Sequence, residues 1–417
     1  MDAALHRMLT VPGLAALLSA GYASWYASFI AARVHVSHDC SCVAGDDRMR
    51  RILELSGCQD LVYYPTFWAP TAFLQLCLLF VKELCIFILP TPYTRDTVVL
   101  RDGQAMAVDW MMPAPGADPA KPVVVLLHGA FQSSHSAPMV SLSRECCAAG
   151  HPVAVMNRRG YELPLSLPKA CMLGFDDDLD EVLVHSVAVR FPGRPVVIVG
   201  FSAGATFSTR YVATRSRRLA AASEASTGSN LTRQIPRILC GVAIDCGFDV
   251  SDEGAISRMA TPVRQFIAVC IWFQYWFRHR HVFQSQSSMP GAAPQIASQE
   301  GKLVQVAAYR YVRQLSRSFS SHEDWCAERQ PELGSISVPF IFINSMDDPV
   351  TVHGNIDSVR IDIEANPNLA LLEFARGGHG CKTGFFGFKD IAPQVVARFI
   401  QAVQATEEGE SEVASQL

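Results

Sequence analysis

Six continuous apolar runs, separated by stretches of helical pattern, constrain the fold of this chain more than any other feature of its sequence. The runs are PVVVLL at 122–127, PVAVMN at 152–157, PVVIVG at 195–200, ILCGVAIDC at 238–246, VPFIFIN at 338–344 and LALLEF at 369–374. Runs that are apolar throughout, rather than alternating, are typical of strands buried on both faces of a sheet. Helical patterns lie between them near 136–149, 176–190, 203–219 and 388–404. The sequence therefore predicts an α/β fold with a mostly parallel central sheet flanked by helices.

The spacing of the runs predicts how the chain is divided. Residues 96–101 and 106–111 are expected to form a hairpin ahead of the first run. The runs at 238–246 and 338–344 are about ninety residues apart, far more than a crossover helix needs, which predicts an inserted helical cap. We therefore expect an N-terminal anchor and apolar lead-in at 1–90, a core in two parts at 91–246 and 337–405, a cap at 247–336 and an acidic tail at 406–417.

The N-terminal region is apolar enough to predict contact with lipid. No residue from Met8 to Ala32 is charged, and the apolar part, Leu14 to Ala32, has close to the ~20 residues that span a bilayer. We interpret it as a single membrane-spanning helix. A second uncharged run, Leu61 to Val81, is interrupted by Pro65 and Pro70. Because basic residues are more frequent after the first run than before it, we expect an endomembrane protein whose catalytic domain is cytoplasmic.

Composition and charge exclude some partners. The 35 basic residues are balanced by 39 acidic ones and form no long basic stretch, so nucleic acid is not expected as a partner. The 13 cysteines, an odd number at low density, favour a reducing compartment. Histidines and cysteines gather between residues 35 and 42, but their spacing matches no standard zinc pattern, so we assign no metal site. The sequence makes no prediction of oligomeric state.

The pentapeptide GFSAG at 200–204 fits the G-x-S-x-G pattern of a nucleophile elbow. It follows a buried strand and opens a helical stretch, the setting in which small residues permit a strained turn that exposes a serine hydroxyl. Ser202 is therefore the candidate nucleophile. A serine hydroxyl is a poor nucleophile until a base takes its proton, so a histidine oriented by a carboxylate is expected elsewhere in the chain.

Candidates for the acid and the base follow two later strands, in the order that this chemistry has on such a fold. The run at 338–344 leads into Asp347-Asp348-Pro349, and the run at 369–374 leads into GGHG at 377–380. We assign His379 as the base and Asp348 as the acid, with Asp347 as the alternative acid. These three groups need no cofactor, and none is expected.

A tetrahedral intermediate needs hydrogen-bond donors for its oxyanion. One donor is expected to be the backbone N–H of Ala203, next to the nucleophile. The other is expected from the loop HGAF at 128–131, where we choose Ala130, with Phe131 as second candidate. We interpret His128 as a structural histidine that braces this loop.

Seven motifs along the chain form a more specific pattern than the elbow alone. They are YPTxW at 64–68, HG at 128–129, NxRG at 157–160, FDDDLDEVLVHSVAVRFP at 175–192, GFS at 200–202, NxxDDP at 344–349 and GGHG at 377–380. With these motifs, the sequence from about residue 60 to 400 resembles the α/β-hydrolases of abhydrolase family 4, which include membrane-anchored lipases and phospholipases. The resemblance implies a Ser202–Asp348–His379 triad, single-pass anchoring, and hydrolysis of acylglycerol or phospholipid esters. Tyr161 departs from the family pattern, which has a small residue there.

The sequence as a whole predicts a serine hydrolase that cleaves acyl esters of lipids at a membrane through an acyl-enzyme. An aromatic stripe at 266–277 is either core of the cap or, with RHRH at 278–281 facing anionic headgroups, a membrane interface. In both cases the apolar walls above the serine favour acyl chains over charged metabolites as substrates. Two alternatives stay open. One is a thioesterase or short-chain carboxylesterase with the same triad, and the other is a catalytically inactive, membrane-bound scaffold.

Overall fold

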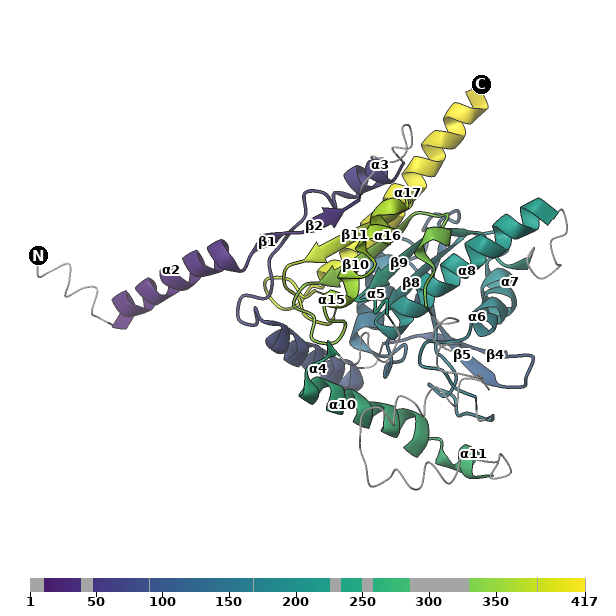
Figure 1. Cartoon of the computed structure of the whole chain (residues 1–417), viewed down its shortest axis with the longest axis horizontal. Helices are drawn as coiled ribbons and strands as arrows, with labels where there is room; N and C mark the ends of the chain where they lie inside the picture. The colour runs from purple at the N-terminus through teal and green to yellow at the C-terminus, as the bar shows by residue number, and fades with distance from the viewer. Residues whose placement is uncertain are drawn as a thin grey trace, which may run out of the picture.

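A nine-stranded sheet runs through the middle of the protein, as the computed structural model shows (Figure 1). The strand order is β2-β11-β10-β9-β8-β6-β7-β5-β4. The six strands from β11 to β7 are parallel to one another, whereas β2, β5 and β4 pair antiparallel. All six predicted runs form strands, so the predicted α/β fold with a mostly parallel sheet is confirmed. The structure describes residues 11–38, 48–89, 91–167, 169–225, 234–249, 258–285, 330–380 and 382–416.

The strands of the large sheet follow the predicted runs closely. The expected hairpin is formed by β4 and β5, and a separate two-stranded sheet pairs β1 with β3. The strands are β1 (Ala32–Arg33), β2 (His35–Ser37), β3 (Val62–Tyr63), β4 (Thr94–Val99), β5 (Ala105–Met111), β6 (Val123–Leu127), β7 (Val153–Met156), β8 (Val196–Phe201), β9 (Ile238–Ile244), β10 (Phe340–Ser345) and β11 (Leu369–Phe374).

Helices cover both faces of the sheet. Side chains of α6, α8 and α16 form an apolar cluster on one face, and those of α3, α5 and α17 form a cluster on the other. The helices near the sheet are α3 (Arg48–Ser56), α4 (Ala72–Ile88), α5 (Ala137–Ala148), α6 (Asp176–Val182), α7 (Ala188–Arg190), α8 (Ala203–Ala225), α15 (Gly354–Asp357), α16 (Arg360–Ala365) and α17 (Ile391–Gln416), with a π-helical turn η1 (Leu183–Val187) between α6 and α7.

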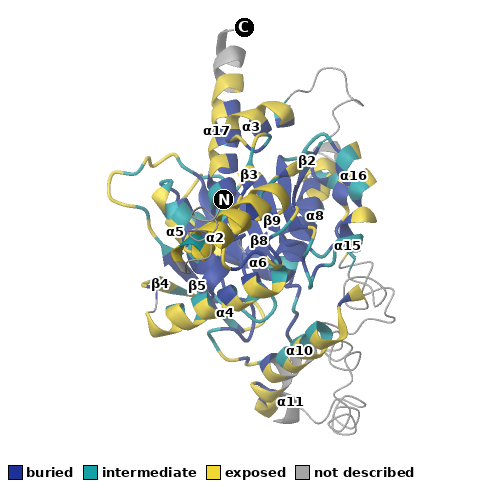
Figure 2. Ribbon diagram, turned by 90° about the vertical axis from the view of Figure 1, so that its left-hand side faces the viewer, coloured by how far each residue is buried: buried dark blue, intermediate teal, exposed yellow. Residues whose placement is uncertain are grey.

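The central strands are apolar at every position because they are buried from both sides. In β6, Val123, Val125 and Leu127 belong to the cluster on one face, and Val124 and Leu126 belong to the cluster on the other. Figure 2 shows these strands as the buried centre of the molecule between the helical layers. The loops that leave the carboxyl ends of the parallel strands are thereby held on a rigid base, and the candidate site lies on these loops.

The predicted membrane span at Leu14 to Ala32 is wrong. α2 (Val11–Phe29) covers most of it, but no helix in the described part of the chain is long and apolar enough to cross a membrane. The prediction rested on the absence of charge, but serines, glycines and tyrosines make α2 too weakly hydrophobic to span a membrane. Its C-terminal part is also bound to the protein, where the hydroxyls of Tyr22 and Tyr26 donate to the carbonyls of Phe67 and Pro65. The expected single-pass anchor, and the localisation based on it, are therefore not supported.

Part of the predicted cap lies within the described residues. It consists of α10 (Thr261–Ile271), the π-helical turn η3 (Trp272–Phe277), α11 (Arg280–Ser285) and, just before β10, the 3-10 turn η4 (Leu333–Ser335). Residues 250–257 and 286–329 of this segment lie outside the described residues. α10 lies beside α4 (Figure 1), where the rings of Phe266 and Phe80 meet edge to face with their centroids 6.0 Å apart. The cap boundaries stay a prediction.

Gly204 offers a test of how closely α8 approaches the sheet. A Cβ at this position would collide with the backbone oxygens of Leu127 and His128. We expect Gly204→Ala to lower the free energy of unfolding by about 1–3 kcal/mol, as overpacking does. Gly409→Ala in α17 is the matched control, since nothing lies within 4 Å of its added methyl group. Urea unfolding of both variants measures the change in stability. Equal unfolding midpoints for the two variants would show that α8 does not lie close enough to β6 to exclude a methyl group.

Candidate active site

The turn between β8 and α8 presents Ser202 at the carboxyl end of the sheet. Ser202 has a left-handed backbone with φ 54°, which is strained for a residue with a side chain. Its N–H donates to the carbonyl of Ile244 at 2.8 Å, which ties the turn to β9. A Cβ at Gly200 would collide with the backbone of Gly204. The elbow glycines are therefore needed for the strand and the helix to meet at this angle.

His379 lies beside Ser202 on the loop that follows β11. Its Nε2 is 2.9 Å from Ser202 Oγ, and its Nδ1 is 2.8 Å from Asp348 Oδ2. The carboxylate accepts, so Nδ1 carries the proton and the Nε2 lone pair faces the serine hydroxyl. The structure thus brings together three residues that are far apart in the sequence and that the sequence analysis predicted to act together.

Asp348 is the carboxylate that reaches the histidine. Its Oδ1 accepts from the backbone N–H groups of Val350 and Thr351 at 2.7 and 3.0 Å, and its Oδ2 accepts from the Thr351 hydroxyl at 2.6 Å. Asp347 accepts from the N–H of Gly378 at 2.9 Å and so anchors the histidine loop. Of the two aspartates left open by the sequence, the geometry favours Asp348 as the acid and gives Asp347 a supporting contact.

Burial and charge together set the protonation of this pair. Burial lowers the pKa of His379, but the charge of Asp348 and the hydrogen bond to it outweigh burial and raise the pKa above its ordinary value. Burial raises the pKa of Asp348, but the imidazole and the other hydrogen bonds lower it to about 2. Asp348 therefore stays ionised beside an imidazole whose basicity it increases.

A second buried ion pair, missed by the sequence analysis, holds the histidine loop. Asp245 follows β9 directly, and its carboxylate accepts from the N–H of Gly380 at 2.7 Å and from the ammonium of Lys382. Lys382 also donates to the carbonyls of Gly378 and Gly380, at 3.3 and 3.1 Å. Both side chains of the pair are 0% exposed. In the sequence, this pair could have been suspected only from Asp245 itself, a charged residue at the end of the apolar run 238–246.

The loop after β6 lies next to the elbow. Ala130 and Phe131 pack against an apolar cluster that contains Ala203, together with Val282 of α11. In the described part of the chain no acceptor is recorded for the N–H of Ala130 or of Ala203. Both groups are therefore available to a ligand, as the oxyanion prediction requires, and their role stays a prediction.

α4 forms a wall of the site. A small recess beside His379 is lined by Gln75, Leu79 and Lys82 of this helix. The ammonium of Lys82 donates to Asp390 at 2.5 Å and to the Thr383 hydroxyl at 2.9 Å, which fixes the helix to the segment that follows the histidine. The apolar lead-in predicted from the sequence is thus part of the site rather than a separate element.

The sequence of this chain has counterparts among known proteins. The model of the alpha/beta hydrolase family matches residues 124–398. The chain belongs to the α/β-hydrolase family. The match covers every strand from β6 to β11 and all the candidate site residues, so it confirms the α/β-hydrolase resemblance seen in the sequence.

Several named proteins are similar to this α/β-hydrolase over most of its length. Phospholipase ABHD3 of Mus musculus is 25% identical over 393 residues, covering 88% of this chain and 84% of the relative. Phospholipase ABHD3 of Homo sapiens is 25% identical over 397 residues, with the same two shares. The monoacylglycerol lipase of Saccharomyces cerevisiae is 24% identical over 280 residues, covering 64% of this chain and 56% of the relative.

Removal of Lys382 tests the buried pair. Burial raises the pKa of Asp245 to about 6 while Lys382 opposes the shift, so Lys382→Met leaves a carboxylate without its counter-charge. We expect a loss of about 3–5 kcal/mol in the free energy of unfolding at neutral pH. The loss should shrink as the pH falls toward 3.8, the ordinary pKa of an aspartate, because protonation removes the uncompensated charge.

The double variant Asp245→Asn with Lys382→Met is the control for this prediction. It removes both charges, so it should regain most of the stability that Lys382→Met loses. Urea unfolding across the pH range measures all three proteins. A double variant as unstable as the single one would contradict the electrostatic explanation.

Proposed function

We propose that the protein is a serine hydrolase that cleaves acyl esters of lipids, such as acylglycerols or phospholipids, through an acyl-enzyme. The observation that carries the proposal is the chain of contacts from Asp348 through His379 to Ser202, at 2.8 and 2.9 Å. The named relatives, two phospholipases and a monoacylglycerol lipase, support the lipid-ester class. In this proposal no cofactor takes part.

The proposed reaction follows from the positions of the polar atoms. The Ser202 hydroxyl attacks the ester carbonyl as His379 Nε2 takes its proton, and Asp348 stabilises the imidazolium that forms. The N–H groups of Ala203 and Ala130 bind the developing oxyanion. His379 then protonates the departing alcohol, and a water molecule attacks the acyl-enzyme with the same histidine as base.

Apolar side chains around the site support an acyl chain as the substrate's reacting part. Ala203, Leu165 and Val282 belong to one buried cluster, and Ile267 of α10 packs against it. α4, whose Gln75, Leu79 and Lys82 line the recess beside His379, also has exposed apolar side chains. These are Phe73, Phe80, Leu84 and Phe87. An apolar lining with a few fixed polar groups is the usual composition of a site for a lipid-like ligand.

Substitution of Ser202 tests the nucleophile. We expect Ser202→Ala to lower kcat for a long-chain monoacylglycerol by at least about 10⁴-fold, since the remaining groups cannot form the acyl-enzyme. Covalent labelling by a fluorophosphonate should map to Ser202 in the native chain and be lost in the variant. Ser208→Ala, a buried serine of α8 that donates only to the carbonyl of Ala205, is the matched control and should keep labelling and turnover.

The same assays separate the alternatives. Hydrolysis of acyl-CoA thioesters or of short-chain esters in preference to long-chain glycerides would indicate the thioesterase or carboxylesterase alternative. A folded native chain that neither labels nor hydrolyses any of these substrates would overturn the proposal and favour the inactive scaffold.

Substitution of the two aspartates tests the acid. Asp348→Asn should lower kcat by about 10⁴-fold, as loss of a triad carboxylate does. Because Asp348 raises the pKa of His379, and the base must be neutral, the acid limb of kcat/KM should also move to lower pH. Asp347→Asn keeps an oxygen for Gly378 N–H and should leave the limb in place. A larger loss in Asp347→Asn would make Asp347 the acid.

A further inference from the structure

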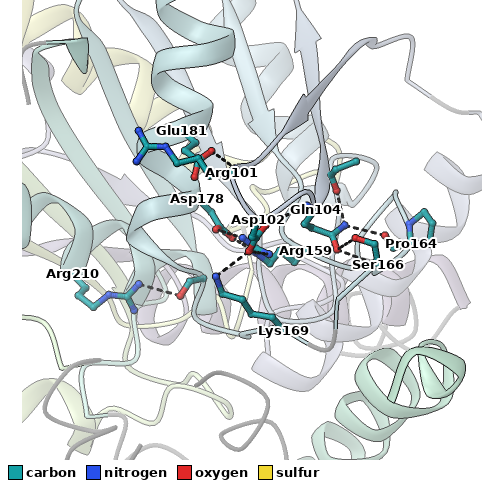
Figure 3. Close-up of polar contacts among 12 residues, drawn as sticks. Arg101, Asp102, Gln104, Arg159, Pro164, Ser166, Lys169, Asp178, Glu181 and Arg210 are labelled. Carbon is teal, nitrogen blue, oxygen red and sulfur yellow. Dashed lines mark hydrogen bonds and ion pairs between the residues drawn. The ribbon is translucent and has the colours of Figure 1, made fainter. Parts of the chain in front are cut away.

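Arg158 is a buried arginine that no described carboxylate contacts. It is 3% exposed, and within the described part of the chain no ion pair joins it to an acidic residue and its Nε and Nη1 atoms have no hydrogen-bond partner. Its neighbour Arg159 is the opposite case, because it binds Asp178 at 2.6 and 2.7 Å and Asp102 at 2.7 Å (Figure 3). A buried guanidinium that lacks a counter-charge is costly, so its retention needs an explanation.

The hydrogen bonds that Arg158 donates all go to the loop after β6. Its Nη2 donates to the carbonyl of Gly129 at 2.5 Å and lies 3.0 Å from His128 Nδ1. The backbone N–H of Arg158 points at His128 Nε2, 3.2 Å away. Since a backbone N–H only donates, Nε2 accepts, and the proton of the neutral ring is on Nδ1. That proton is donated to the same carbonyl of Gly129, at 2.8 Å.

The histidine stays neutral in this arrangement. Burial lowers the pKa of His128 well below its ordinary value, and the charge of Arg158 lowers it further. Arg158 therefore supplies the one positive charge in the contact, and His128 supplies a neutral donor. These two donors of different charge converge on one carbonyl oxygen, which also accepts from the backbone N–H of Gln132 at 3.4 Å.

The carbonyl of Gly129 and the N–H of Ala130 belong to the same planar peptide unit. In a trans peptide the two groups point in opposite directions, so donors that fix the carbonyl also fix the direction of the N–H. Donation to a carbonyl also polarises the amide and strengthens its N–H as a donor. The neighbouring groups are held too, as Gly129 N–H donates to the side chain of Gln132 at 3.1 Å and the Tyr161 hydroxyl donates to the carbonyl of Ala130.

We propose that Arg158 is a positioning residue for the oxyanion, acting through the Gly129–Ala130 peptide. Its guanidinium aims and polarises the Ala130 N–H, and its charge, which no acidic residue of the described ranges compensates, is compensated when the substrate oxygen becomes negative. This inference rests on the proposed function. Tyr161, which stands where the family pattern has a small residue, completes the arrangement by covering the guanidinium with its ring, 5.5 Å from the centroid.

Arg158→Met tests the inference. Because the charge acts on the transition state rather than on the ester, we expect kcat to fall by about 10²-fold and KM to change little. A trifluoromethyl ketone, whose adduct with a serine carries an oxyanion, should bind more weakly by a similar factor. Arg158→Lys keeps a charged donor and should regain part of the loss, whereas Arg158→Gln, which keeps only a neutral donor, should regain less.

Urea unfolding of the variants and the activity of the native chain distinguish failure of this inference from failure of the proposed function. A residue with a merely structural role would lower the urea midpoint when replaced, whereas removal of an unpaired buried charge should leave it unchanged or raise it. A folded Arg158→Met with native kcat, or with undiminished affinity for the ketone, would overturn the inference while the proposed function stands. If Arg158→Met does not fold, equal kcat for Arg158→Lys and Arg158→Gln would overturn it. A native chain without ester hydrolysis would overturn the proposed function itself.

Discussion

The contact between the first turn of α8 and the carboxyl ends of β6 and β8 is the constraint on which the site depends. Glycine at 200 and 204 leaves no side chain between the two layers, and a methyl group at either position would collide with backbone. This contact forces Ser202 into a left-handed conformation and places the N–H of Ala203 beside the loop of Ala130. The cost of that strained residue is of the order of 1–3 kcal/mol and is offset by the packing of the whole helix on the sheet.

Near this contact, buried charged side chains hold two loops in position, the loop after β11 and the loop after β6. The loop that carries His379 is bound by two aspartates, Asp347 after β10 and Asp245 after β9, which accept from its backbone N–H groups. Lys382, just after the histidine, adds an ion pair with Asp245. The loop after β6 is held by Arg158, which follows β7 and donates to the carbonyl of Gly129. Because the carboxyl ends of parallel strands meet at one edge of the sheet, anchors from different strands can converge there without long insertions.

Much of the fold could be predicted because burial on both faces leaves a plain signature, six uninterrupted apolar runs. The order of Ser202, Asp348 and His379, which follow the predicted runs that form β8, β10 and β11, could be read in the same way. The choice between Asp347 and Asp348 was not, since both lie in one turn and only its three-dimensional path decides which carboxylate meets the imidazole. The pairs Asp245–Lys382 and Arg158–Gly129 are 137 and 29 residues apart and have no local pattern. The lack of charge in α2 was mistaken for hydrophobicity, although its tyrosine hydroxyls bind backbone carbonyls.

The pairing of the edge strand β2 affects when the sheet can be completed during synthesis of the chain. It pairs with β11, and His38, just after it, contacts the carbonyl of Leu369, 331 residues away in the sequence. At typical rates of synthesis, roughly 5–20 residues per second, this N-terminal strand waits tens of seconds for its partner to leave the ribosome. Through that interval the exposed aromatic side chains of α4 are already present while the strand that leads to the histidine loop is not. The edge of the sheet is therefore completed only when β11, the last strand to be made, pairs with β2.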